Sequence, residues 1–417
     1  MRLNKVISTN LLAVFFLALT GCTNFEYHET ENVPITQLSA EQEAEVVEEE
    51  LLDVGIVLFN SGQVDLDTND TDFSSVRDSE AVWFTQKIKQ TLDDSNAWGL
   101  VRALPHDKLP LDVTIYGEII KSNGEQLTLQ ITAVDNRGVE WINKEYHQQV
   151  SQYAYNPEVS LPGDPFQATF NQIANDLFDY QGALSGIERQ RLRSLTKVLF
   201  ARDFVPDAFS EFVSEDEKGR LSLVRIPAAD EPMMQRVERI RSRNDLFVDV
   251  VQDFYRTFNS KMDLPYTEWR KLAYKETIYA RQLKEQARKE RIAAIAALAG
   301  GVVAATSSNS RTGQIGGHGA IIGGAALYRQ SFAKTDRALS HSATLRELSE
   351  SLETELEPSI VALQDRSVTL SGTVEDQYDE WRRILAQMFR LEEGVDIPAS
   401  FDSELESNIV QDSDSVE

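Results

Sequence analysis

The residue whose type and position point most directly to chemistry is Cys22, the only cysteine of the chain. Arg2 and Lys5 precede an apolar run over residues 11–19, and two small residues stand directly before the cysteine. A charged start, a short apolar stretch and a small-residue break are typical of a secretory signal peptide. The run is too short for a transmembrane helix, which needs about 20 apolar residues. A sole cysteine also excludes a disulfide within the chain.

The four residues Leu19-Thr20-Gly21-Cys22 resemble the lipobox of bacterial lipoprotein signals. The resemblance implies that residues 1–21 are a signal peptide and that Cys22 is lipidated and becomes the first residue of the mature protein. Because Thr23 follows in place of aspartate, it implies sorting to the outer membrane, with a lipid anchor on Cys22 holding the protein at the periplasmic face.

Other reactive side chains do not form recognisable sites. The histidines lie in separate regions, with no pair at the spacing of helical metal ligands: His28, His106, His147, His318 and His341. Residues 65–69 begin like a calcium loop, but Asp70 and Val76 stand where glycine and glutamate are required. A nucleophile elbow and a nucleotide-binding glycine fingerprint are absent from the sequence. We therefore expect no catalytic residue, no metal site and no cofactor, and a protein that is not an enzyme.

The composition limits the partners. A chain of 417 residues accommodates two or three domains, and its formal net charge of −26 argues against nucleic acid, whose phosphates require clustered lysine and arginine. The same charge disfavours electrostatic adhesion to anionic lipid, so the lipid anchor must provide the attachment. Acidic residues concentrate in residues 22–51, an expected tether, and in residues 397–417, an expected disordered tail.

The first folded region is expected over residues 52–182. A buried strand is predicted at 54–59 and a helix at 79–92, where Phe84, Ile88 and Leu92 recur at helical spacing. Alternating strands at 112–120, 127–134 and 139–150 are joined by turns at Asn123-Gly124 and at 136–138. A second helix begins near Asp164. The resulting β-α-β-β-β-α order predicts an α+β sandwich in which one sheet face packs on two helices. The other face would carry Thr114, Tyr116, Glu118, Thr128 and Gln130.

This order resembles the amino-terminal domain of TolB, which is shared by the curli-secretion lipoprotein and by lipoprotein activators of penicillin-binding proteins. The resemblance lies in residues 55–59, the meander over 113–146, and Asp164-Pro165-Phe166 with its helix. An unrelated α+β domain is the alternative.

Residues 187–291 read as helical, with Pro206, Pro227, Pro232 and Pro265 predicted to break the region into pieces. A stripe of apolar residues is expected to face the core: Val237, Ile240, Leu246, Val250 and Phe254. Aromatic residues are dense between 254 and 279, which favours packing among helices over a partner surface.

Residues 292–328 combine small and apolar residues at four-residue spacing around a polar turn at 307–311. The positions expected to pack are Ala293, Ala297, Gly301, Gly316, Gly319, Gly323 and Gly324. Small residues at this spacing let helix backbones approach closely. The segment resembles the glycine-zipper hairpins of envelope proteins. Each arm is too short to span a membrane alone, since fourteen residues rise only about 21 Å. Insertion into a membrane or oligomer and a soluble helical hairpin both remain open.

Residues 340–396 are predicted to form a small carboxy-terminal α/β module. It would contain a helix at 344–355, strands at 359–363 and 368–374, and a helix at 377–391 with Tyr378, Trp381, Leu385 and Met388 on one face. Residues 368–374 and 393–395 resemble a BON domain, a module of envelope proteins associated with membrane or polymer attachment. Residues 396–398 interrupt the final strand expected of that family.

These features predict a non-enzymatic lipoprotein that acts as a scaffold or assembly factor for an envelope structure, with an envelope protein or a second copy of itself as partner. An oligomeric secretion or pore component that inserts the hairpin is one alternative. An activator of a peptidoglycan synthase is another.

Overall fold

The computed structural model describes residues 34–35, 50–62, 76–156, 163–228, 232–305, 359–363, 366–370 and 373–392. The fold is α+β, built on a five-stranded mixed sheet of order β2-β1-β3-β4-β5. Strand β1 pairs in parallel with β2 and β3, and β3, β4 and β5 form an antiparallel meander. The strands are β1 (Val54–Val57), β2 (Val101–Leu104), β3 (Val113–Ser122), β4 (Gln126–Asp135) and β5 (Glu140–Gln149).

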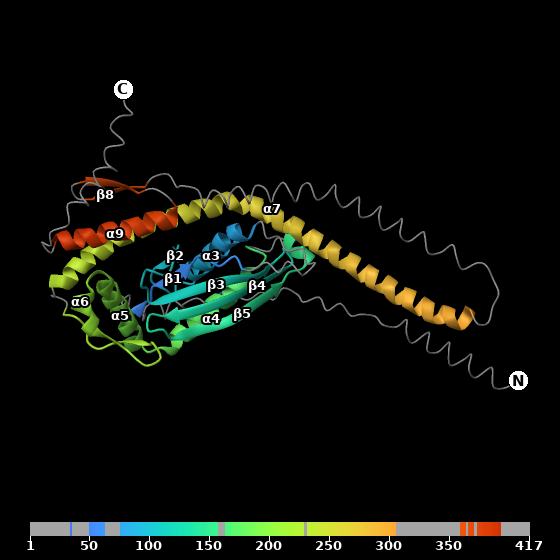
Figure 1. The fold of residues 1–417 in the computed structure, drawn as a ribbon, viewed down its shortest axis with the longest axis horizontal. Coiled ribbons are helices and arrows are strands. Elements are labelled where there is room, and N and C mark those ends of the chain that lie inside the picture. The colour runs from blue at the N-terminus through green and yellow to red at the C-terminus, as the bar shows by residue number, and fades with distance from the viewer. Residues whose placement is uncertain are drawn as a thin grey trace, which may run out of the picture.

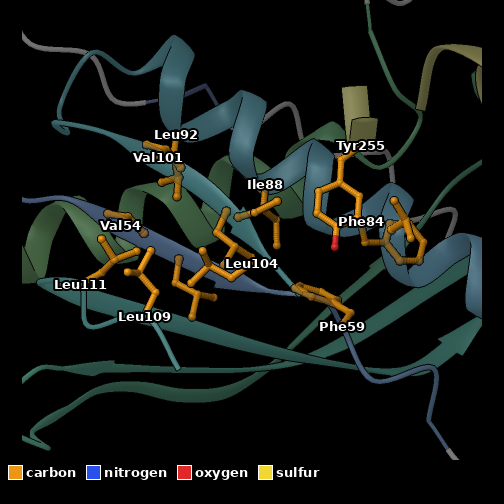
Figure 2. Packing of buried hydrophobic residues seen from close by; sticks show 14 of the residues in the cluster. Val54, Phe59, Phe84, Ile88, Leu92, Val101, Leu104, Leu109, Leu111 and Tyr255 are labelled. Atoms are coloured by element: carbon orange, nitrogen blue, oxygen red, sulfur yellow. The ribbon is translucent and has the colours of Figure 1, made fainter. Parts of the chain in front are cut away.

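Two helices, α3 (Arg77–Asp94) and α4 (Gln167–Ala183), pack on one face of this sheet (Figure 1). The predicted stripe of α3 is confirmed, because Phe84, Ile88 and Leu92 are all completely buried. Figure 2 shows these three side chains on the α3 side of the sheet. The alternating residues of β3 and β4 that face the helices are buried as well: Val113, Ile115, Ile119, Leu127, Leu129 and Ile131. Burial of these side chains stabilises the layer by about 25 cal/mol per Å² of apolar surface.

Strand β2 was not among the predicted elements, so the observed order is β-α-β-β-β-β-α. Four residues give a weak strand pattern here, because all of them, Arg102 included, are buried, so that exposure does not alternate along the strand. Leu109 and Leu111 of the β2–β3 connection cover the face opposite α3 (Figure 2). A Cβ at Gly55 would lie 2.6 Å from the Leu111 side chain and 2.7 Å from that of Leu104, so a larger residue there would displace both leucines.

Beyond the short η3 turn (Gln152–Tyr155) and α4, the chain forms α5 (Gly186–Phe204), α6 (Pro206–Phe209), η5 (Ser210–Phe212) and a small hairpin of β6 (Val213–Glu215) and β7 (Leu221–Leu223). Helix α5 begins with a capping box in which the Ser185 hydroxyl accepts from the Glu188 amide and the Glu188 carboxylate accepts from the Ser185 amide. Asn136 at the β4–β5 turn donates to the Leu192 carbonyl and to Thr196, both on α5. This end of the sheet is therefore closed by α5.

Helix α7 (Pro232–Ala305) is one continuous helix of 74 residues, about 110 Å long. The predicted break at Pro265 is wrong. Proline removes one backbone hydrogen bond and kinks a helix, but buried side chains on both sides of it hold the two halves together. These are Tyr255, Phe258, Met262, Tyr266 and Trp269, all at most 4 % exposed. Their burial also confirms that the dense aromatics pack within the protein.

The predicted core stripe of α7 is only partly correct. Val237 and Ile240 are buried, but Leu246 and Val250 are 67 % and 49 % exposed. Phe247 and Val251 are buried instead, so the true stripe is shifted by one residue after Ile240. A shift of one residue rotates the buried face by about 100°, which periodicity alone did not fix over this stretch.

The carboxy-terminal elements are a hairpin of β8 (Ser359–Leu363) and β9 (Arg366–Leu370) and helix α9 (Val374–Glu392). The predicted face of α9 is confirmed, since Tyr378, Trp381 and Leu385 are buried. Its main partner, however, is α7, along which it lies in Figure 1, and the Trp381 and Phe247 rings stack with centroids 5.6 Å apart. The described part of the predicted module thus shares its core with α7. The predicted helix at 344–355 lies outside the described residues.

Candidate functional site

The residues predicted to carry function fall into two groups. Cys22 and the second-arm positions Gly316, Gly319, Gly323 and Gly324 lie outside the described residues. Ala293, Ala297 and Gly301 lie on α7, and their four-residue spacing places them on one stripe of its backbone. The first helix of the predicted hairpin, which was expected to begin at residue 292, is therefore the end of α7. It continues the helix of the preceding region, residues 187–291, without a break.

This end of α7 reaches beyond the body of the protein. The last ion pair that the described side chains form between α7 and the sheet joins Arg281 to Glu125 at 2.7 Å. Residues 282–305 then continue for about 36 Å, and no other described element lies beside them in Figure 1. Among the described residues, no helix is both long and apolar enough to cross a membrane. We call residues 282–305 the arm.

A buried ion pair fixes α7 to the body near the base of the arm. Arg270 Nη1 on α7 donates to Asp164 Oδ1 at 2.9 Å, directly before α4, and each side chain is 2 % exposed. The Arg270 guanidinium also lies 4.5 Å from the ring centroid of Tyr266 and 5.6 Å from that of Trp83. Burial opposes the charge of Asp164, but the adjacent guanidinium holds the pKa of this carboxyl below its usual value. Both groups are therefore charged at neutral pH.

A second buried carboxyl, that of Glu80 on α3, lies beside this pair. Glu80 Oε1 accepts hydrogen bonds from Ser122 Oγ on β3 at 2.5 Å and from the Tyr266 hydroxyl at 2.7 Å. Arg77 Nη1 lies 3.7 Å from the other oxygen of Glu80. Burial raises the pKa of Glu80 despite these favourable neighbours. Hydrogen bonds to this one carboxyl thus join α3, β3 and α7.

The β3–β4 turn presses directly against α7. Gly124 has a φ of +76°, and a Cβ there would lie 2.4 Å from the Arg270 carbonyl oxygen. Thr277 Oγ1 donates to the Asn123 carbonyl at 3.1 Å. Only glycine permits this close approach of two backbones. We call this turn, the Arg270–Asp164 pair and the Glu80 cluster the clamp.

At its other end, α7 closes the β2 edge of the sheet. The Gln252 side-chain amide accepts from the Ala103 N–H and donates to the Ala103 carbonyl, each at 2.8 Å. This pair of bonds reproduces what a neighbouring strand would provide. Arg102 of β2 adds an ion pair to Asp245 of α7 at 2.7 Å.

Helix α9 adds a further contact between the carboxy-terminal region and the body. Asp379 pairs with Lys108 at 2.7 Å and lies 3.2 Å from Nε2 of His106, both in the β2–β3 connection. The hydrogen bond from Lys108, together with its charge, lowers the pKa of Asp379, whereas burial lowers the pKa of His106. These charges orient α9 across the connection.

The sheet face opposite α3 and α4 presents the residues predicted for it, with one exception. Tyr116 is 37 % exposed, and Gln130 Nε2 donates to Asn143 Oδ1 on β5 at 2.8 Å. Thr128 is only 8 % exposed, because it lies against His147 on the neighbouring strand, with Oγ1 2.8 Å from Nδ1. The prediction of an exposed Thr128 is therefore wrong.

Within the described residues, no group of histidine, cysteine, aspartate or glutamate is placed to hold a metal ion. The carboxyls of Glu80 and Asp164 are closed in by side chains on every side, so they act on the packing of α7 and present no reactive group to solvent. A depression of about 320 Å³ between β5 and α4 is lined by Trp141, Ile142, Asn143, Lys144, Asp176 and Asp179.

The clamp and the Gln252 contact were missed by sequence reasoning. Arg270 is 106 residues from Asp164, and Gln252 is 149 residues from Ala103. The spacing of neighbouring residues does not predict contacts between residues so far apart in sequence. The one sequence sign at this place is the Asn-Gly turn at 123–124, which indicated the turn but not the helix against it.

Comparison with known proteins adds no relative to this description. The chain matches no protein-family model, and no curated protein matches it at a significant level.

Proposed function

We propose that this protein is a non-enzymatic scaffold of the outer membrane, anchored through lipid on Cys22 and facing the periplasm. In this proposal the α+β body is held near the membrane and the arm of α7 reaches a second envelope component. The acidic residues 22–51 connect lipid and body in this proposal, and within them the Pro34 carbonyl accepts from Asn175 on α4 at 2.8 Å and Ile35 packs against the core.

The observation that carries the proposal is the construction of α7. One helix is fixed at the β2 edge, along α9 and at the clamp, and then leaves the body for about 36 Å. Its last fourteen residues, 292–305, contain no charged side chain. A helix that is apolar all round is typically buried in a partner or a membrane. A fixed helix with an apolar end supports a role in holding two bodies together.

A second candidate, an oligomeric secretion or pore component, is favoured by one specific observation. Ala293, Ala297 and Gly301 share a stripe of the arm, and small residues at this spacing let helices pack closely. In this candidate, arms from several copies associate with one another. The scaffold needs only one copy and a different partner.

Sizing of the lipidated protein in mild detergent separates the two candidates. If the arms associate, Gly301→Leu and Gly323→Leu should collapse a large species, whereas the volume-conserving Ile295→Leu should leave it intact. A single-copy species in the unmutated protein removes the oligomer. For the scaffold, deletion of residues 292–328 should abolish recovery of a crosslinked envelope partner without lowering the melting temperature of the body. Full recovery after the deletion contradicts the scaffold.

The anchor is tested separately. Cys22→Ser should leave the protein unprocessed or soluble, because a lipidated cysteine carries enough acyl chains for stable attachment. Labelling with a palmitate analogue should disappear in this variant. Label that persists would refute the assignment of Cys22.

A further inference from the structure

The two edges of the central sheet differ. The β2 edge is closed by the Gln252 side chain, which bonds both the N–H and the carbonyl of Ala103. Strand β5 forms the other edge, and over residues 140–149 its outer side has no backbone partner in the described part of the chain. Proteins usually cover such edges, because unpaired N–H and carbonyl groups are a template for another strand.

The ladder between β4 and β5 fixes which groups point outward. The Val150 N–H donates to the Glu125 carbonyl at 2.9 Å, so these residues form a hydrogen-bonded pair. Hydrogen-bonded and non-bonded pairs alternate in an antiparallel ladder. In the register that pairs Leu129 with Tyr146, the backbone groups of Asn143, Glu145 and His147 therefore point away from β4. The side chains of these three residues are exposed.

Lysine on an edge strand commonly discourages pairing, but Lys144 is turned away from the outer edge. Its ammonium lies 2.7 Å from Asp176 on α4 and 4.6 Å from the ring centroid of Tyr146. Strand β5 is also ten residues long, whereas edge strands that avoid pairing are usually short. The edge is therefore long and open.

A shallow depression between β5 and α4 lies beside this edge. The depression of about 320 Å³ is lined by four consecutive residues of β5 and by Asp176 and Asp179 of α4. Asp176 is already paired with Lys144, but Asp179 is exposed and has no ion-pair partner among the described residues. One unbalanced carboxylate at the side of an open strand selects a basic side chain.

We propose that the outer edge of β5 binds an extended peptide segment of a partner protein, which joins the sheet as an added strand and places a lysine or arginine against Asp179. Main-chain hydrogen bonds to Asn143, Glu145 and His147 provide the attachment, and the depression provides the selectivity, as in other complexes formed by strand addition. This inference deepens the proposed scaffold function and rests on it for the existence of a partner.

The probe for this mode is a phage-displayed library of random decapeptides, selected against the purified full-length mature chain. Selected peptides should be enriched in lysine or arginine. Glu145→Pro removes an outward N–H without removing a bond to β4, a change that edge strands tolerate. It should weaken binding at least tenfold, whereas the matched control Glu145→Ala should bind like the unmutated protein.

Charge reversal tests the depression. Asp179→Lys should abolish binding of a selected basic peptide and restore binding when the basic residue of the peptide is replaced by glutamate. The equivalent change at an exposed carboxyl elsewhere, Asp207→Lys, should have no effect. A library that yields no peptide sensitive to Glu145→Pro overturns the proposal, as does a basic peptide that is insensitive to Asp179→Lys.

Hydrogen exchange gives a readout that does not depend on the folding of a variant. Bound peptide should slow exchange of the Glu145 and His147 amides, and the Lys144 amide, already bonded to β4, should not change. Unchanged exchange at Glu145 and His147 with peptide bound also overturns the proposal. Because arm variants are judged by particle size and partner recovery, failure of the β5 edge and failure of the scaffold are distinguishable.

Discussion

Arg270 and Asp164 form an ion pair of 2.9 Å in which neither side chain is more than 2 % exposed. The pair joins the long helix α7 to the segment that begins α4, and it lies directly under the β3–β4 turn. Water is excluded from both groups, so each charge depends on the other. The pair is the most buried of the ion pairs that hold α7 on the body, beside those of Arg102 with Asp245 and of Arg281 with Glu125.

Arg270→Met should destabilise the protein by about 3–5 kcal/mol, because it leaves the Asp164 carboxylate buried without a counter-charge. The free energy of unfolding from urea titration at pH 7 checks this. Arg256→Met removes an exposed ion pair on the same helix, with Asp253, and should change the stability by less than about 1 kcal/mol. Equal losses in the two variants would show that Arg270 has no special role.

Gln252→Leu should open the β2 edge. Loss of the side-chain amide leaves the N–H and carbonyl of Ala103 facing an apolar group, which costs about 1–3 kcal/mol. Exchange of the Ala103 amide with deuterium should accelerate, while that of Ile115 in the sheet centre changes only with global stability. Gln235→Leu, at an exposed position of the same helix, is the matched control. An unaltered exchange rate at Ala103 contradicts the edge-closing role.

Asp112 gives the stability a defined pH dependence. Burial raises its pKa to about 6 from an ordinary 3.8, although the Thr196 hydroxyl and the Asp53 amide donate to it. Folding therefore favours the protonated acid, and this contribution is complete below about pH 4 and is lost as the pH rises through about 6. The loss is about 2–3 kcal/mol.

Asp112→Asn mimics the protonated acid and should remove this dependence. Compared with the variant, the unmutated protein should lose stability between pH 4 and pH 7 in urea titrations. The exposed Asp207→Asn controls for the removal of one charge. The assignment would be falsified if the difference in free energy of unfolding between the Asp112 variant and the unmutated protein did not depend on pH. A change with pH in the opposite direction would contradict it as well.

The open sheet face is a second place where a partner could dock. Tyr116→Ala combined with Gln130→Glu alters two positions of this face and should cost about 1 kcal/mol of stability or less. If the face is an interface, recovery of a crosslinked partner by the lipidated protein should fall at least tenfold, equivalent to about 1.4 kcal/mol. Undiminished recovery with an intact fold places the interface elsewhere.

Local patterns predicted the sheet well and the helical region less well. The meander β3–β5 was predictable, because its strands alternate and the Asn123-Gly124 turn lies at the joint. The stripe of α3 was predictable for the same reason. Strand β2 was missed, since a short strand covered on both faces has no periodic pattern to detect.

The errors on α7 have a different cause. Proline lowers the intrinsic stability of a helix, but at Pro265 packing of Tyr266 and Trp269 on the body overrides that local cost. Which residues of α7 are buried after Ile240 depends on the element that packs against them. That element is α9, whose Trp381 stacks on Phe247 and is more than a hundred residues away in sequence. The clamp has the same property. Long-range partners, absent from local periodicity, decide which side of a long helix is buried.

The arm has a mechanical consequence that follows from where its support ends. Arg281, bound to Glu125, is the last described side chain that braces α7, so the helix beyond it behaves as a lever with its fulcrum at the β3–β4 turn. A tilt of about 5° at that fulcrum would displace Ala305 by about 3 Å, given about 36 Å of helix beyond it. Movements of the sheet that are too small to break the hydrogen bonds between its strands are thus amplified at Ala305. Conversely, a force on that end of the arm acts as a torque on the contact with Glu125.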